Sequence, residues 1–162
     1  MTPSKKIVVL GHFGVGKSSL IRSFIENSFS EDYKVTIGVQ ISKKTVTLQD
    51  NKNISLILWD LEGQDEVTKV RSSYLLGTNG FIYVFDLSRP STFENLSSEL
   101  EFIKENYQET PIKVVGNKMD LVTKSYLKQY NDVLEPFVDF MTSAKTGSKV
   151  ESLFTKLAQD LL

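Results

Sequence analysis

The sequence of 162 residues contains no cysteine and a single histidine. Without cysteine the chain has no disulfide, no cysteine-ligated zinc and no cysteine nucleophile. Prenyl and palmitoyl groups also attach to cysteine, and the residue after Met1 is Thr2 rather than the glycine that N-myristoylation requires. We therefore expect no direct lipid anchor on this chain.

Long apolar runs and a large net charge are lacking as well. No run approaches the roughly 20 residues of a membrane-spanning helix, and the N-terminal residues lack the pattern of a secretory signal. Lysine and arginine (19) balance aspartate and glutamate (20), which argues against a nucleic-acid-binding protein. We expect a cytoplasmic protein of one domain, residues 1–162, recruited to membranes only through a partner or a segment outside this sequence.

Strand and helix patterns alternate along the chain. Strands are predicted over residues 6–10, 36–48, 54–59, 80–85, 112–115 and 137–141, and helices over 20–26, 126–134 and after each of two capping boxes. The capping boxes are Ser91 with Glu94 and Ser148 with Glu151. Pro136 is expected to end the helix over 126–134.

This alternation predicts an α/β fold with a mostly parallel sheet and helices on both faces. The turn QDNKN at residues 49–53 joins two strands as a hairpin and adds one antiparallel edge strand. In such sheets ligands bind beyond the carboxyl ends of the strands, so functional residues are expected there.

A glycine-rich stretch, GHFGVGKSS, joins the first strand to the first helix. It matches G-x-x-x-x-G-K-[ST], in which glycines let successive N–H groups point at one anion and the helix N-terminus adds its positive dipole end. Lys17 would reach the terminal phosphates, and the Ser18 hydroxyl would bind Mg²⁺. The loop predicts a phosphate site with ATP and GTP both open as ligands; its residues are Gly14, Val15, Gly16, Lys17, Ser18 and Ser19.

The segment Asn117-Lys118-Met119-Asp120 follows a predicted buried strand and favours guanine. Guanine presents two adjacent donors, N1–H and the N2 amine, and the carboxylate of Asp120 can accept from both. Adenine has an acceptor and no amine at these positions, so a site built on Asp120 would reject it. The sequence therefore predicts a guanine-nucleotide site that also involves Asn117 and Lys118.

Over nearly its whole length the chain resembles the Ras-superfamily small GTPases, most closely the Rab and Ras branches. The motifs GHFGVGKS, DYKVTIG, WDLEGQ, NKMD and TSAK occur in the order of that family, and SFSEDYKVTIG has a Rab-like character. The resemblance implies the P-loop NTPase fold of a G domain. It also implies GTP and GDP with Mg²⁺ as ligands, and hydrolysis of GTP that is slow without an activating protein.

The resemblance further implies roles at the base and at the metal. Phe29 would lie against the guanine ring, and Ser143, Ala144 and Lys145 would border the base from the other side. Thr36 and Asp60 would join Ser18 at Mg²⁺, Asp60 through a water. Tyr33 would lie near Thr36 in the first switch.

For catalysis the resemblance implies Gln64 and Lys17, with the Gly63 N–H at the γ-phosphate and Gln64 orienting the attacking water. Taken singly, three of these residues have a structural alternative: Phe29 in the core, Thr36 in an ordinary edge strand and Gln64 in a solvated loop. Their common register with the phosphate loop favours the functional roles.

Two segments depart from the family pattern. Phe13 stands where many relatives carry a small residue, and a bulky side chain there would crowd Gln64 and an arginine supplied by an activating protein. Leu61-Glu62 replaces the usual Thr-Ala before Gly63, which brings a carboxylate close to the γ-phosphate. The alternative is that these side chains point to solvent.

Three functions are therefore open. The favoured one is a GTP-hydrolysing switch whose loops, roughly residues 30–38 and 61–72, bind effector, exchange factor and activating proteins. The second is a nucleotide-binding interaction module with negligible hydrolysis, which Phe13 and Glu62 keep open. The third, a P-loop kinase or ATPase, is disfavoured by NKMD. We expect Trp59 and the methionines to pack, and His12 to be a loop residue without a chemical role.

Overall fold

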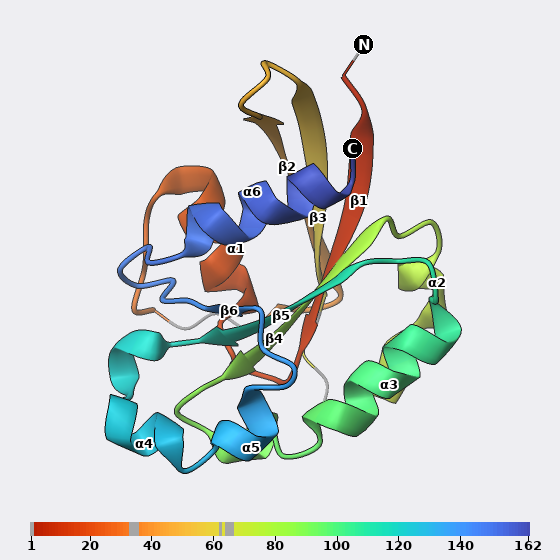
Figure 1. Cartoon of the computed structure of the whole chain (residues 1–162). Coiled ribbons are helices and arrows are strands. Elements are labelled where there is room, and N and C mark those ends of the chain that lie inside the picture. Colours follow the sequence, from red (N-terminus) through yellow and green to blue (C-terminus); the bar gives the residue numbers. More distant parts are fainter. Residues whose placement is uncertain (1, 33–35, 62, 64–66) are drawn as a thin grey trace.

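The computed structural model describes residues 2–32, 36–61, 63 and 67–162. Within these residues a six-stranded sheet has the order β2-β3-β1-β4-β5-β6 (Figure 1). Its neighbouring strands are parallel except β2 and β3, which are antiparallel. The predicted α/β class, mostly parallel with one antiparallel edge strand, is confirmed. The strands are β1 (Ser4–Gly11), β2 (Val39–Thr47), β3 (Asn53–Leu61), β4 (Gly80–Asp86), β5 (Ile112–Asn117) and β6 (Phe140–Met141).

Helices connect the parallel strands. The α-helices are α1 (Lys17–Glu26), α2 (Ser72–Leu75), α3 (Leu96–Asn106), α4 (Lys124–Lys128), α5 (Asn131–Leu134) and α6 (Val150–Asp160). Short 3₁₀ helices are η1 (Val67–Lys69), η2 (Pro90–Thr92) and η3 (Met119–Leu121). In the part of the chain that the structure describes, no helix combines the length and the apolar composition that crossing a membrane requires.

The sheet separates two hydrophobic cores, and successive residues of β1 alternate between them. Ile7 and Val9 pack in the core that contains α1 and α6, whereas Val8 and Leu10 pack in the core that contains residues of α2, α3 and α5. Figure 1 shows α1 and α6 on one side of the sheet and α2 and α3 on the other. Because both faces of the central strands are buried, polar residues of these strands collect at the strand ends.

Two predictions are wrong, one in the first half of the chain and one in the segment after β4. The strand predicted over residues 36–48 begins only at Val39, so Thr36 precedes it. The capping box of Ser91 and Glu94 does not form: η2 occupies this segment, and α3 begins later, after Asn95. The reason is Thr92, whose Oγ1 donates to the Arg89 carbonyl (2.8 Å) and accepts from the Asp86 N–H (3.0 Å), so the chain makes a tight turn instead.

The helix predicted over residues 126–134 is two short helices, α4 and α5. At the break, Tyr130 has φ −113° and its ring packs edge-on against Phe93, with ring centroids 5.3 Å apart. The strand predicted over 137–141 is only β6, because the N–H groups of Phe137 and Val138 bond back to the Leu134 carbonyl.

The capping box predicted for the last helix, Ser148 with Glu151, is wrong as well. Helix α6 begins after Lys149, which is left-handed (φ 64°), and no side chain caps it. The Ser148 carbonyl accepts from the Ser143 N–H at 3.2 Å, which ties this loop to the end of β6. Tertiary contacts in the loop therefore override the local cap.

Lys6 connects β1 to the segment around α2. Its Nζ donates to the carbonyls of Tyr74 and Leu76, each at 2.7 Å, and lies 3.7 Å from the centroid of the Trp59 ring. The Lys6 N–H also donates to Asn79 Oδ1 at 2.8 Å, and the Asn79 N–H returns to the Lys6 carbonyl. Trp59 therefore packs, as expected, and the chain from Tyr74 to Asn79 is held against β1.

The stacked rings of Phe24 and Phe154, 3.9 Å apart and nearly parallel, join α1 to α6. Both side chains are buried, so Phe154→Ala should lower the free energy of unfolding by about 3–5 kcal/mol through lost burial and a cavity. Denaturant unfolding of proteins loaded with the same nucleotide measures the change. Val133→Ala, at a half-exposed site, is the control and should change stability little. Equal effects of the two substitutions would contradict the importance of this pair.

Candidate functional site

A cavity of about 370 Å³ opens at the carboxyl ends of the strands, where the fold predicts a ligand site. Many of the site residues predicted from the sequence line this cavity: Gly14, Gly16, Lys17, Ser18, Ser19, Phe29, Thr36, Gly63, Asn117, Lys118, Asp120, Ala144 and Lys145. Val15, Asp60 and Ser143 are hydrogen-bonded to these residues. Tyr33, Glu62 and Gln64 lie outside the described residues. The structure therefore brings together most of the residues that the sequence singled out.

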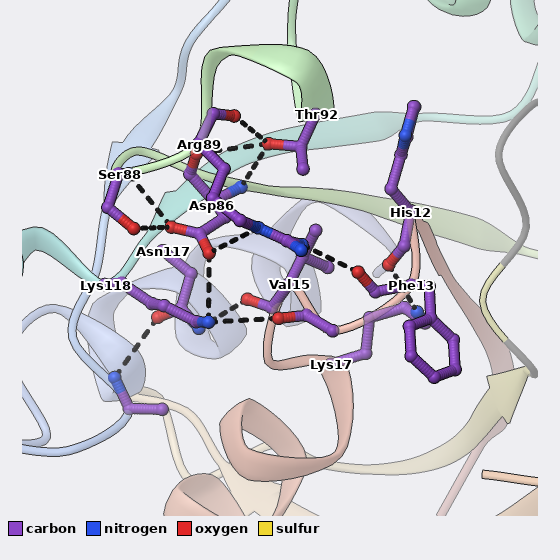
Figure 2. Close-up of polar contacts among 12 residues, drawn as sticks. His12, Phe13, Val15, Lys17, Asp86, Ser88, Arg89, Thr92, Asn117 and Lys118 are labelled. Carbon is purple, nitrogen blue, oxygen red and sulfur yellow. Dashed lines mark hydrogen bonds and ion pairs between the residues drawn. The ribbon is translucent and has the colours of Figure 1, made fainter. Parts of the chain in front are cut away.

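Five consecutive backbone carbonyls of the phosphate loop (residues 11–18) accept hydrogen bonds from side chains. Lys17 Nζ donates to the carbonyls of Gly11 (3.3 Å) and His12 (3.2 Å). The next three carbonyls accept from other elements: Phe13 from Arg89 Nη2 (2.7 Å), Gly14 from Lys118 Nζ (3.0 Å) and Val15 from Asn117 Nδ2 (3.1 Å) (Figure 2).

This pattern orients the amides of the loop. In a planar trans peptide the N–H points opposite to the preceding carbonyl. The carbonyls of Phe13, Gly14 and Val15 point at side chains. The N–H group of the residue after each of them therefore points in the opposite direction, away from those side chains. Consecutive N–H groups that converge in this manner form an anion site. Gly16 completes it with a left-handed conformation (φ 99°), where an added Cβ would overlap Asn117 Nδ2.

The ammonium group of Lys17 supplies a buried positive charge at this site. Burial lowers the pKa of Lys17 from 10.5 to about 8, against the opposing charge of Asp60. A buried cation whose protein partners are mostly carbonyls is stabilised by an anion beside it. Gly63 lies close by, since a Cβ there would come within 3.1 Å of Lys17 Nζ and 2.7 Å of Phe13 Cα. Only glycine allows this approach.

Ser18, Thr36 and Asp60 form a second cluster next to Lys17. Ser18 Oγ lies 2.8 Å from Thr36 Oγ1 and donates to Asp60 Oδ2, while Asp60 Oδ1 has no hydrogen-bond partner among the described residues. Burial raises the pKa of the Asp60 carboxyl above its ordinary value, although the hydrogen bond from Ser18 and the charge of Lys17 oppose this shift.

These oxygens fit a Mg²⁺ site that is shared with bound phosphates. Among the described residues no three histidine, cysteine or acidic side chains gather as a metal cage. A Mg²⁺ ion that binds together with phosphates does not need such a cage, because its ligands are one or two carboxylates, hydroxyl oxygens and the phosphates themselves. Asp60, with one unpartnered oxygen, and the hydroxyls of Ser18 and Thr36 match that donor set.

At the other end of the cavity the carboxylate of Asp120 is held by Ser143, whose Oγ donates to Asp120 Oδ1 at 2.8 Å. Phe29 is 39% exposed and lines the cavity, so the alternative that it belongs to the core is wrong. Lys145 Nζ pairs with Glu31 Oε1 at 3.2 Å across the opening. A flat ring and a carboxylate acceptor thus line the same cavity, and a purine can use both groups.

Asn117 contributes in a way that its motif alone did not reveal. Its side chain is buried: Nδ2 donates to Val15, and Oδ1 accepts from Thr142 Oγ1 (3.1 Å) and the Ala144 N–H (3.2 Å). Asn117 therefore lines the cavity and also connects the phosphate loop to the loop that carries Ser143 and Lys145.

The Ras family model covers residues 6–162. The chain belongs to the Ras family. That family consists in general of GTP-binding switches with GTPase activity, which bind GTP and GDP with Mg²⁺ and act through regulator and effector partners. The geometry described above is consistent with this membership.

Asp86 and Arg89, which the sequence did not single out, lie beside the site of this Ras-family chain and contact its residues. Asp86 is 1% exposed, at the end of β4, and its Oδ2 pairs with both Lys118 Nζ (2.9 Å) and Arg89 Nε (3.0 Å) (Figure 2). Burial opposes the charge of Asp86, but hydrogen bonds from Ser88 and Lys118 outweigh it and lower the pKa of its carboxyl. The one available signal was an acidic residue directly after the apolar run 80–85.

His12 lies in the loop after β1, as expected, and has a definite partner. Its Nε2 lies 3.2 and 3.3 Å from the two oxygens of Glu99, which is buried on α3. This contact ties the phosphate loop to the helix beside it. Phe13, the next residue, is 46% exposed and lines the cavity.

The lowered pKa of Lys17 predicts that nucleotide binding takes up protons. Bound phosphates favour the charged ammonium, so binding raises a pKa that starts at about 8. At about pH 9, where phosphates and carboxylates are already ionised, we expect proton uptake and an affinity that falls as pH rises further. Calorimetry of nucleotide-free protein with GDP, in buffers of different ionisation heat, measures it. Lys17→Arg should remove the uptake and Lys145→Arg should keep it; uptake that is absent from the wild type would contradict the assignment.

Proposed function

We propose that this protein binds GTP and GDP with Mg²⁺ and acts as a molecular switch that hydrolyses GTP slowly. The observation that carries the proposal is that one cavity is lined at one end by the phosphate loop with its buried Lys17 and at the other end by Asp120. An anion site and a purine-reading carboxylate joined in one cavity are what a guanine nucleotide requires.

At the phosphate end, the loop amides and the Lys17 ammonium bind and orient the phosphates. Mg²⁺, held by Ser18, Thr36 and Asp60, would supply positive charge against the phosphate oxygens when bound. Gly63 lies close to Lys17 Nζ, and we propose that its N–H donates to the γ-phosphate. These groups are fixed by the protein before the substrate arrives, and such preorganised charges stabilise the charge that develops in phosphoryl transfer.

At the base end, Asp120 accepts the two guanine donors and Ser143 keeps its carboxylate in place. Phe29 and Lys145 lie along the faces of the ring. Adenine would cover the Asp120 carboxylate without offering it the two donors, and a carboxylate that loses its water contacts without gaining hydrogen bonds lowers affinity.

The hydrolysis step depends on Gln64, which the family resemblance assigns to the attacking water. Phe13 supports a slow rate, because its backbone lies close to Gly63 and its half-exposed ring lines the same cavity. The same observation favours the second function, an interaction module with negligible hydrolysis. The two functions share a nucleotide site and differ in turnover.

The switch part of the proposal concerns residues 30–38 and 61–72. Thr36 of the first loop contacts Ser18, and Gly63 of the second loop lies close to Phe13 and Lys17. A bound nucleotide would therefore influence the conformation of both loops. We propose that effector, exchange factor and activating proteins bind there. A Rab-like subtype is supported by SFSEDYKVTIG and by the SSY sequence of α2.

Asp120→Asn tests the base assignment. The amide can no longer accept from both guanine donors, so the preference for GTP over ATP should fall by at least about tenfold. Competition of the two nucleotides against a fluorescent GDP measures it. Asp132→Asn, at an exposed position of α5, is the matched control. An unchanged preference in Asp120→Asn would refute the role of this carboxylate.

Turnover distinguishes the two functions. Single-turnover hydrolysis of GTP should be slow in the wild type and about 10- to 100-fold slower in Gln64→Ala, because the attacking water is no longer oriented. Phe13→Gly should hydrolyse GTP faster by a similar factor, because the crowding is relieved. GTP that stays intact for days in the wild type and in Phe13→Gly would establish the interaction module instead.

A further inference from the structure

Two cations behind the phosphate loop share one carboxylate oxygen. Arg89 Nε and Lys118 Nζ lie 3.0 and 2.9 Å from Asp86 Oδ2, and each cation also donates to a loop carbonyl. Arg89 Nη2 reaches Phe13, and Lys118 reaches Gly14 (Figure 2). Consecutive carbonyls of the loop are thereby held from outside by a single buried charge.

The carboxylate itself is rigidly placed. Asp86 is the last residue of β4 and pairs in register with Asn117 of β5. Ser88 donates its N–H (2.9 Å) and its Oγ (2.6 Å) to Asp86 Oδ1, and Thr92 closes the turn that follows. Both carboxylate oxygens therefore have partners, and the group points at the loop from a central strand of the sheet.

We infer that Arg89 and Asp86 are positioning residues of the phosphate loop, which keep the Phe13 and Gly14 carbonyls turned away from the bound phosphates and thereby slow the release of nucleotide. This inference rests on the proposed function. Neither residue belongs to the motifs that the family resemblance supplied. If the carbonyls turned inward, their negative ends would face the phosphates, and the N–H groups of Gly14 and Val15 would leave them.

Arginine suits this position for a geometric reason. Its planar guanidinium presents several N–H donors in a fixed fork, so one side chain donates to the Asp86 carboxylate and the Phe13 carbonyl at the same time. A lysine ammonium has no such fork. Because the Arg89 side chain is 44% exposed, removing it should leave the fold intact and change mainly the loop.

Arg89→Gln tests the inference directly. We expect GDP to dissociate about tenfold faster than from the wild type, which corresponds to the loss of hydrogen bonds made by a charged group. Arg89→Lys should give an intermediate rate. Release of a fluorescent GDP, chased with excess GDP, measures it. The matched control is Lys113→Met, which breaks the partly buried pair with Asp160 (2.7 Å) away from the loop and should leave the release rate unchanged.

A second readout separates positioning from general destabilisation. In the GDP complex of Arg89→Gln, the amide NMR signals of Gly14 and Val15 should shift, whereas those of the β2–β3 hairpin should stay in place. Asp86→Asn should release GDP at least as fast as Arg89→Gln, because it removes the charge that both cations share. If Asp86→Asn does not fold, the two Arg89 variants decide alone.

The possible results are distinct. Faster release in Arg89→Gln with shifted loop amides supports the inference. Wild-type release from Arg89→Gln, or equal acceleration by Lys113→Met, overturns it while the proposed function stands. A wild-type protein that retains no guanine nucleotide overturns the proposed function, and this inference falls with it.

Discussion

An anion-binding loop must keep its carbonyl dipoles away from the anion, and the site of this protein depends on that constraint. The carbonyls of residues 11–15 accept hydrogen bonds from side chains: Lys17 from within the loop, Arg89 from the turn after β4, and Asn117 and Lys118 from the end of β5. The charge of Asp86 holds two of these groups together. Glycines permit the shape of the loop, but the neighbouring strands determine it.

The parallel sheet makes this possible, because it brings the carboxyl ends of distant segments to one edge. β4 lies between β1 and β5, so the residue that ends β4 faces the loop on one side and the base-binding segment on the other. Asp60 reaches the same edge from β3, and Thr36 lies just before β2. The cavity is thus a product of strand order, and its two ends are coupled through Asn117 and Lys118.

Features that depend on a local sequence pattern could be predicted from the sequence. Six strands, the hairpin, the phosphate loop and the carboxylate of Asp120 follow from apolar runs and from motifs with a fixed geometry. Predictions failed where a tertiary contact competes with a local preference. Thr92 accepts a hydrogen bond from the Asp86 N–H, and a tight turn replaces the cap predicted at Ser91. Ser148 accepts a hydrogen bond from the Ser143 N–H and does not cap α6. Asp86 and Arg89 were missed for the same reason, because their roles exist only after β1, β4 and β5 pair.

The attachment of Lys6 has a mechanical consequence for the proposed switch. Hydrogen bonds from one lysine clamp the stretch from Tyr74 to Asn79 onto the neighbouring strand β1, just before β4 starts. If the protein switches as proposed, a displacement that starts at Gly63 would meet this anchored segment before it reaches β4. The interior strand that carries Asp86 would then keep its place in both nucleotide states.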